Sequence, residues 1–209
     1  MNNPGLFQAR WNLRRLALCN LVPVALLAFW LWPTGQMLCV LFDEWLFHLL
    51  NSPLATDPIW LHVWAIASLR PFDAVVGVIL LTLLIKGDWV FKAGDVRQAF
   101  FGFFGILLLL LFIRMLFSKL TGHMGWQHSS PSMMIDSAVR MSNYFPGLEA
   151  RWELKDRSTQ SFPGDHASVL LIWALFMTVF SRTAWQTVVI WALALLFMMP
   201  RLVAGAHWG

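Results

Sequence analysis

The chain has 209 residues, of which 58% are hydrophobic and 12% are charged, and its formal net charge is +4. This composition excludes an ordinary soluble domain with a charged surface and indicates a membrane protein. The basic residues are scattered among apolar segments rather than gathered on one face, which argues against a nucleic-acid-binding protein.

Five apolar segments are predicted to cross the bilayer as helices, because each reaches or approaches the length that a span needs. They cover residues 16–32, 74–85 with the residues just before them, 98–117, 166–180 and 185–199. We expect the first to be a retained helix rather than a signal peptide, since no small-x-small cleavage site follows it. Two further segments, 37–51 and 58–69, are shorter or more charged, and the first of them is expected to lie along the interface.

Basic residues in the short loops predict the orientation of the spans. They fall on one side if the spans alternate: Arg10, Arg14, Arg15, Lys86, Lys92, Arg97 and Arg182. By the positive-inside rule this side is the cytoplasm. The long polar segment 118–165 and the chain end then share the outer face, and a loop of this length without periodicity is often functional. We therefore expect segment 118–165 to carry part of a site.

The hexapeptide Ser161-Phe-Pro-Gly-Asp-His166 precedes the fourth predicted span. A Pro-Gly turn before a helix directs backbone N–H groups and the positive end of the helix dipole at one point, which suits a phosphate. We expect Gly164 and Asp165 to help bind such an anion and His166 to take part in chemistry. The alternative is a polar N-cap before a membrane helix.

Arg201 and His207 follow the fifth predicted span, six positions apart. The guanidinium of arginine matches phosphate oxygens, and histidine can be a nucleophile toward phosphorus or an acid and base. Together with His166 and the Pro-Gly turn, these residues place two histidines, an arginine and backbone donors on the outer face. This combination predicts phosphoryl transfer.

These motifs resemble those of the type 2 phosphatidic acid phosphatase superfamily, whose core is shared with vanadium haloperoxidases. Pro163-Gly-Asp-His166 is similar to that family's Pro-Ser-Gly-His motif, and Arg201 with His207 is similar to its Ser-Arg-x5-His-x3-Asp motif. The stretch from Phe197 to Trp208, the hexapeptide and Lys155-Asp-Arg157 look most like the lipid A 1-diphosphate synthase branch. Members of that branch move a phosphate from undecaprenyl pyrophosphate to lipid A.

The resemblance implies an all-α, polytopic membrane helical bundle in the bacterial inner membrane, with its active site facing the periplasm. It implies that His207 attacks phosphorus to form a phosphohistidine and that His166 protonates the leaving oxygen. Arg201 and the N–H groups around Gly164 would hold the transition-state oxygens, with neither a metal nor a cofactor. Positioning and charge stabilisation carry most of such a reaction.

The sequence departs from the family pattern in three places. The family's first motif, Lys-x6-Arg-Pro, has no clean match; Lys119 and His128 are the best candidates for its basic residues, with Arg114 in reserve. The family's serine is Gly164 here, so one hydroxyl donor is lost. The acid expected four positions after His207 and a sixth span would both fall beyond Gly209. We therefore expect one membrane domain over residues 1–209 that lacks its C-terminal end.

Two alternatives remain at the level of sequence. In the first, water is the acceptor, and the protein is a phosphatase of undecaprenyl pyrophosphate or of a phosphatidic-acid-type lipid. In the second, the protein is a non-catalytic membrane protein that binds an anionic headgroup through Arg201, Lys119 and the turn. A haloperoxidase is disfavoured, because its substrates are water-soluble and this chain is built of membrane spans.

Overall fold

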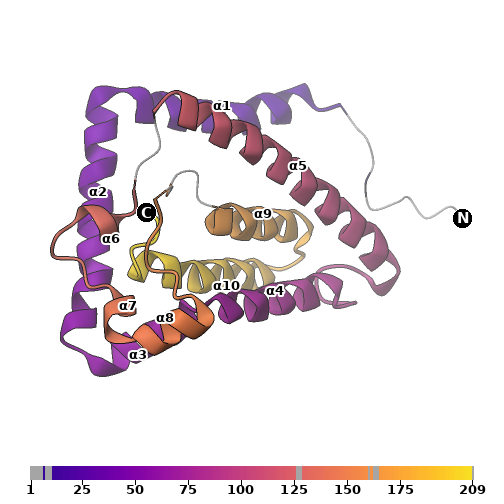
Figure 1. The fold of residues 1–209 in the computed structure, drawn as a ribbon. Helices are drawn as coiled ribbons and strands as arrows, with labels where there is room; N and C mark the ends of the chain where they lie inside the picture. Colours follow the sequence, from indigo (N-terminus) through magenta and orange to yellow (C-terminus); the bar gives the residue numbers. More distant parts are fainter. Residues whose placement is uncertain (1–6, 8–10, 126–128, 160, 162–164, 209) are drawn as a thin grey trace, which may run out of the picture.

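The computed structural model describes residues 7, 11–125, 129–159, 161 and 165–208. This part of the chain contains helices and no strand (Figure 1), which confirms the all-α prediction for the residues described. The α-helices are α1 (Leu13–Leu31), α2 (Pro33–Asn51), α3 (Pro58–Ala67), α4 (Arg70–Ile85), α5 (Val96–His123), α6 (Pro131–Met134), α7 (Met141–Tyr144), α8 (Pro146–Trp152), α9 (Asp165–Phe180) and α10 (Ala184–Val203). The 3-10 turns η1 (Ser52–Ala55) and η2 (Ala93–Asp95) precede α3 and α5.

Three helical segments of the described chain are long and apolar enough to cross a membrane. They are α1, the continuous segment Ala93–His123 that includes α5, and α10. The other two predicted spans form α4 and α9, which have 16 residues each. At 1.5 Å per residue such a helix is about 24 Å long, which is less than the roughly 30 Å of a bilayer's hydrocarbon core.

The chain turns sharply between α1 and α2 at Trp32-Pro33 (Figure 1). Trp32 is extended, with φ −76° and ψ 128°, because the residue before a proline avoids the helical region. Pro33 then starts α2, where its missing N–H costs nothing. The predicted interfacial segment 37–51 is therefore part of a 19-residue helix that begins earlier than expected.

A hydrophobic core joins α4, α5, α9 and α10. Its largest buried side chain is Trp173 of α9, whose indole N–H donates a 3.2 Å hydrogen bond to the Leu80 carbonyl of α4. Helices α9 and α10 form a hairpin, and the side chains of Thr183 and Gln186 cap the start of α10 reciprocally. This packing fixes the ends of α4, α9 and α10 close to one another.

A second hydrophobic cluster lies at the C-terminal end of α10 and contains residues of η1, α3, α7 and α10. Asn51, buried at the end of α2, links its parts. Its side-chain amide donates to the carbonyls of Val139 and Val203, and its side-chain oxygen accepts the N–H of Val139 at 2.8 Å. The end of α2, the segment before α7 and the end of α10 are thereby held together.

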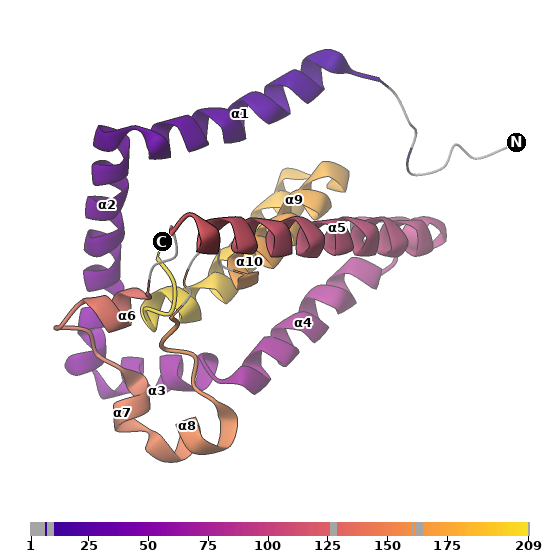
Figure 2. The same ribbon diagram turned by 45° about the horizontal axis from the view of Figure 1, so that its top comes forward.

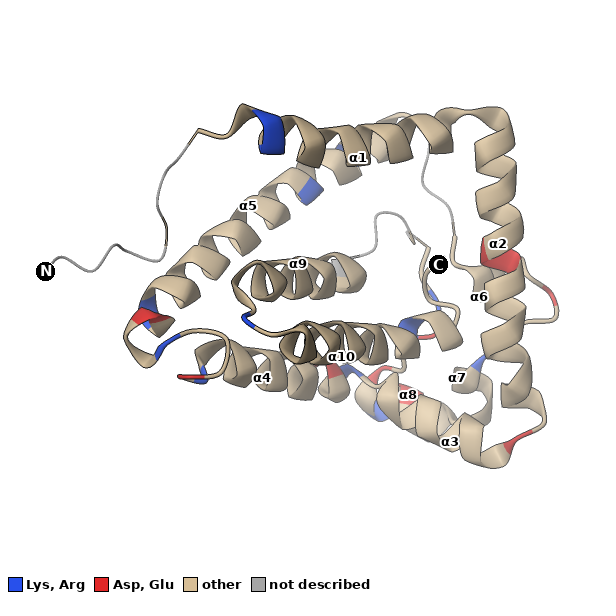
Figure 3. Ribbon diagram, turned by 180° about the vertical axis from the view of Figure 1, so that it is seen from behind, with Lys and Arg blue, Asp and Glu red and all other residues tan. Residues whose placement is uncertain are grey.

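The predicted outer loop 118–165 is largely structured where it is described. Helix α5 extends to His123, and α6, α7 and α8 follow before a non-helical stretch that begins at Glu153. This stretch pairs with the residues at the start of α4 and just before it: the N–H of Arg70 donates to the Glu153 carbonyl, and the N–H of Lys155 donates to the Ser68 carbonyl. Charged residues gather at helix ends and around α7 and α8 (Figure 3).

Candidate active site

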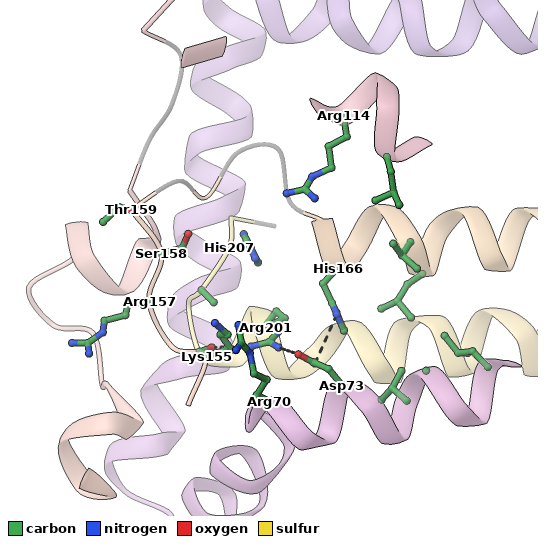
Figure 4. Close-up of a pocket in the computed structure, with 17 residues that line it drawn as sticks. Arg70, Asp73, Arg114, Lys155, Arg157, Ser158, Thr159, His166, Arg201 and His207 are labelled. Carbon is green, nitrogen blue, oxygen red and sulfur yellow. Dashed lines mark hydrogen bonds and ion pairs between the residues drawn. The ribbon is translucent and has the colours of Figure 1, made fainter. Parts of the chain in front are cut away.

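A cavity of about 720 Å³ lies between the ends of α4, α5, α9 and α10 (Figure 4). Its polar lining comprises Arg70, Asp73, Arg114, His166, Arg201, His207 and the segment Lys155, Arg157, Ser158 and Thr159. Five of these residues are Lys or Arg and one is Asp. A cavity with this excess of basic side chains attracts anions.

Asp73, in the first turn of α4, contacts both Arg201 and His166 (Figure 4). Its Oδ2 forms an ion pair with Nη2 of Arg201, and its Oδ1 lies 3.8 Å from Nδ1 of His166. The Arg201 side chain is only 8% exposed. A guanidinium buried to this extent needs a charged partner and carbonyl acceptors, and Asp73 and the Lys155 carbonyl at 3.4 Å supply them.

His166 is the second residue of α9, and both of its ring nitrogens face acceptor oxygens. Nδ1 faces Asp73, and Nε2 lies 3.3 Å from the carbonyl oxygen of Phe197 on α10. A carbonyl and a carboxylate can only accept hydrogen bonds. An N–H of the ring could therefore donate to the Phe197 carbonyl, and the Asp73 carboxylate lies near the other ring nitrogen.

His207 has a different environment, which fixes its tautomer. Its Nδ1 lies 3.0 Å from the carbonyl oxygen of Ser161 and 3.4 Å from the hydroxyl of the same residue. Because the carbonyl can only accept, Nδ1 carries the hydrogen and the lone pair of the neutral ring is on Nε2. Nε2 is therefore the ring nitrogen that could act as a nucleophile.

The turn after α10 sets the position of His207. Gly205 has φ +67°, and its carbonyl accepts the N–H of Ser132 at 3.1 Å. A Cβ at this glycine would lie 2.5 Å from the Phe47 ring, so the position needs glycine for both conformation and space. On the other side of His207, the indole N–H of Trp208 donates to the Ser129 carbonyl at 3.0 Å.

The structure brings three of the predicted site residues, His166, Arg201 and His207, to this one cavity. Asp165 is the first residue of α9, and its side chain is outside the described part of the structure. Gly164 and His128 also lie outside the described residues. Lys119 is exposed on α5 and does not line the cavity, whereas Arg114, the reserve candidate, does. Figure 4 shows Arg114 extending toward the cavity from the side opposite Asp73.

Sequence reasoning missed Arg70 and Asp73. Both lie in the first turn of α4, just before the apolar segment that was predicted to span. An ionisable residue at the start of such a segment is itself a signal of function, and that signal could have found them.

Lys155 and Arg157 were noted only for their resemblance to the branch, and each has an acidic partner. Lys155 pairs with Glu153, which also forms a 2.9 Å ion pair with Arg70. Arg157 lies 3.2 Å from Glu149 and points away from Arg201 in Figure 4. The hydrogen bond from Lys155 lowers the pKa of the Glu153 carboxyl, and the charges of Lys155 and Arg70 lower it further.

No group of three or more His, Cys, Asp or Glu side chains in the described part of the chain could hold a metal ion. The chemistry that the described side chains offer is that of two histidines, a carboxylate and several guanidinium groups. Together they can bind an anion, attack it and supply a proton.

Comparison with known proteins gives one informative relative. The chain is 27% identical over 203 residues to the lipid A 1-diphosphate synthase of Escherichia coli (strain K12), and the aligned region covers 94% of this chain and 79% of that protein. No family model matches the chain. No solved structure matches it either. The chain is therefore a distant relative of lipid A 1-diphosphate synthase.

Proposed function

We propose that the protein is a membrane phosphotransferase that moves a phosphate from undecaprenyl pyrophosphate to lipid A through a phosphohistidine on His207. The observation that carries the proposal is the cavity shared by His207, His166 and Arg201. The relationship to lipid A 1-diphosphate synthase supports the choice of donor and acceptor. The proposed location is the bacterial inner membrane, with the cavity at its periplasmic face.

In the first half-reaction, Nε2 of His207 attacks the terminal phosphorus of the donor. The Nε2–P bond forms while the bond from phosphorus to the bridging oxygen breaks, and undecaprenyl phosphate leaves. His166 gives its proton to the leaving oxygen. Arg201 neutralises charge on the non-bridging oxygens in the transition state, which is the largest contribution that a protein makes to such a reaction.

In the second half-reaction, a phosphate oxygen of lipid A attacks the phosphohistidine. His166, now neutral, takes the proton of the attacking group, and the P–Nε2 bond breaks to restore His207. Once phosphorus is bound to Nε2, a ring that keeps its Nδ1 hydrogen is positively charged, and the Ser161 carbonyl accepts that hydrogen until the second step. Backbone N–H groups around Gly164, with Asp165 and His128, remain predicted ligands of the phosphate. Arg114, which lines the cavity, takes the place of Lys119, which does not.

The test uses the purified protein in detergent with undecaprenyl pyrophosphate that is radiolabelled on its terminal phosphate, with and without lipid A. We expect label on lipid A, and we expect His207→Ala to abolish it. His166→Ala should lower turnover by about 100-fold or more, because both half-reactions use its proton transfer. His123→Ala is the matched control, because His123 is exposed at the end of α5 and does not line the cavity.

Free labelled phosphate in place of labelled lipid A would assign the protein as a phosphatase. If no lipid phosphate is turned over in a manner that depends on His207, the enzymatic proposal is wrong. Binding of anionic lipid that survives His207→Ala would then identify the protein as a non-catalytic lipid-binding protein.

A further inference from the structure

The cavity continues beyond the polar site into an apolar part, and three helices show the same order of residues along it. On α4, Asp73 is followed by Val76, Gly77 and Leu80, and on α9, His166 is followed by Val169 and Leu170. These intervals of three, four and seven residues keep the side chains on one face of each helix. Helix α5 runs in the opposite sense, and there Leu111 precedes Arg114.

We call the apolar part of the cavity the apolar arm; its lining is Val76, Gly77, Leu80, Leu111, Val169 and Leu170. From Asp73 to Leu80 is seven residues along α4, or about 10 Å of helix rise. The arm therefore extends from the polar site along the helices for roughly a third of the thickness of a bilayer's hydrocarbon core. A phosphate alone has no use for a lining of this kind.

The arm opens sideways between α4 and α5. These two helices diverge from their connection toward the site, as Figure 2 shows. Gly77 on α4 and Leu111 on α5 both line the cavity and are both exposed, Leu111 to 45%. A Cβ at Gly77 would meet no atom within 4 Å. The side of the bundle at this position is apolar, since Leu108, Leu109 and Phe112 of α5 are exposed as well.

We infer that the apolar arm holds the first part of the hydrocarbon chain of a lipid phosphate, which enters from the bilayer between Gly77 and Leu111. The inference rests on the proposed function and adds to it, because it states where the chain of the lipid lies when its phosphate is beside His166 and Arg201. Gly77 is then a specificity-determining residue: its missing side chain leaves the space through which the chain passes.

Gly77→Phe tests the inference by filling this space. We expect kcat/KM for undecaprenyl pyrophosphate to fall at least tenfold. For isopentenyl pyrophosphate, whose chain is too short to extend along the arm, we expect less than a twofold change. Gly105→Phe is the matched control, because Gly105 lies on α5, also has no atom within 4 Å of an added Cβ, and does not line the cavity. Equal losses with both substrates, or no loss with either, would overturn the inference.

A second measurement does not need turnover and keeps Gly77 in place. A photoreactive benzophenone side chain is introduced at Leu111, and at Leu109 in a matched variant, and each protein is irradiated with radiolabelled undecaprenyl phosphate. Leu109 is 57% exposed but lies two residues away, on another face of α5. We expect labelling at position 111 to exceed labelling at position 109 at least fivefold and to be competed by unlabelled lipid.

Equal labelling at the two positions would contradict the inference whether or not the protein is an enzyme. Selective labelling at position 111 without any His207-dependent turnover would instead disprove the proposed function and leave the lipid-binding arm standing. The two failures are therefore distinguishable.

Discussion

Helix α1 and the C-terminal end of α10 are packed in opposite ways. None of the residues of α1 is buried, and its side chains are apolar apart from Arg14, Arg15 and Asn20. At the C-terminal end of α10, by contrast, Arg201 and the residues from 203 to 206 are buried, with polar contacts to Asp73, Ser132 and Ser161. A bilayer can accommodate α1 without contacts to the rest of the protein. The difference shows that the site depends on protein contacts that come from distant parts of the chain.

The largest effect is expected when the ion pair at the packed end is broken. Arg201→Ala removes a proposed phosphate ligand and leaves Asp73 without its guanidinium partner. We expect turnover of undecaprenyl pyrophosphate to fall by about 100- to 1,000-fold. We also expect the free energy of unfolding to fall by about 2–3 kcal/mol, because a partly buried carboxylate loses its counter-charge. Steady-state kinetics and thermal unfolding in detergent measure the two losses.

Arg182→Ala is the control for this ion pair, since Arg182 is exposed in the turn between α9 and α10. Asp73→Asn should lower turnover by about tenfold, or about 1.4 kcal/mol in activation free energy. Combined with Arg201→Ala, it should restore part of the lost stability. If Arg201→Ala retains turnover within twofold of the native protein, the guanidinium has no place in the chemistry.

A smaller effect is expected from the turn that carries His207. Gly205→Ala puts a Cβ 2.5 Å from the Phe47 ring at a residue with φ +67°. We expect a loss of about 2–3 kcal/mol in stability and a rise in KM or a fall in kcat as His207 moves. Gly125→Ala is the control, because Gly125 has φ +69° but an added Cβ meets nothing within 4 Å.

The difference between the stability losses of these two variants separates the effect of packing from that of backbone strain. Calorimetry or thermal unfolding of each variant measures the two losses. A loss at Gly205→Ala no larger than the loss at Gly125→Ala would show that contact with Phe47 does not hold the turn.

The smallest effect is expected in α2, between the two extremes of packing. Burial raises the pKa of the Asp43 carboxyl to about 6. The folded protein then holds this proton more tightly than the unfolded chain does. The protonated carboxyl therefore contributes fully to the free energy of unfolding below pH about 4, and this contribution is lost as the pH rises through about 6. We expect the loss to be about 1–2 kcal/mol, after a discount for the part of the side chain that is exposed.

Asp43→Asn should make the midpoint of thermal unfolding less dependent on pH across this range. Glu44→Gln, at an exposed neighbouring position, should leave the pH dependence of the midpoint as it is in the native protein. A slope that Asp43→Asn does not change would assign the pH dependence to another group.

The fold was predictable where one stretch of sequence determines one helix. The apolar runs 166–180 and 185–199 with a short turn between them predict the α9–α10 hairpin, and the structure contains it. The five-span count was less secure, because α4 and α9 fall short of the length that identifies a span by itself. The span predicted as 74–85 with the residues just before it corresponds to α4, which begins at Arg70, since Pro71 fits the first turn of a helix.

Within the site, the common level of His166, Arg201 and His207 followed from their positions next to apolar runs on the same side. The contact between Asp73 and Arg201 could not be predicted, because 128 residues separate the two and only the packing of α4 against α10 joins them. The carbonyl of Ser161 beside His207 was equally hidden, since every residue has a carbonyl and the sequence does not say which one faces a ring. The roles of these residues in catalysis stay predictions.

The ion pair between Asp73 and Arg201 also bears on how the protein is made. Synthesis runs from the N-terminus, so α4 is made before the α9–α10 hairpin exists. Until that hairpin inserts, Asp73 is a carboxylate without its arginine at the start of an apolar helix. Arrival of Arg201 brings the counter-charge and completes the cavity in the same step. A partly inserted chain therefore lacks the complete cavity, and the proposed site forms only when α9 and α10 have joined α4.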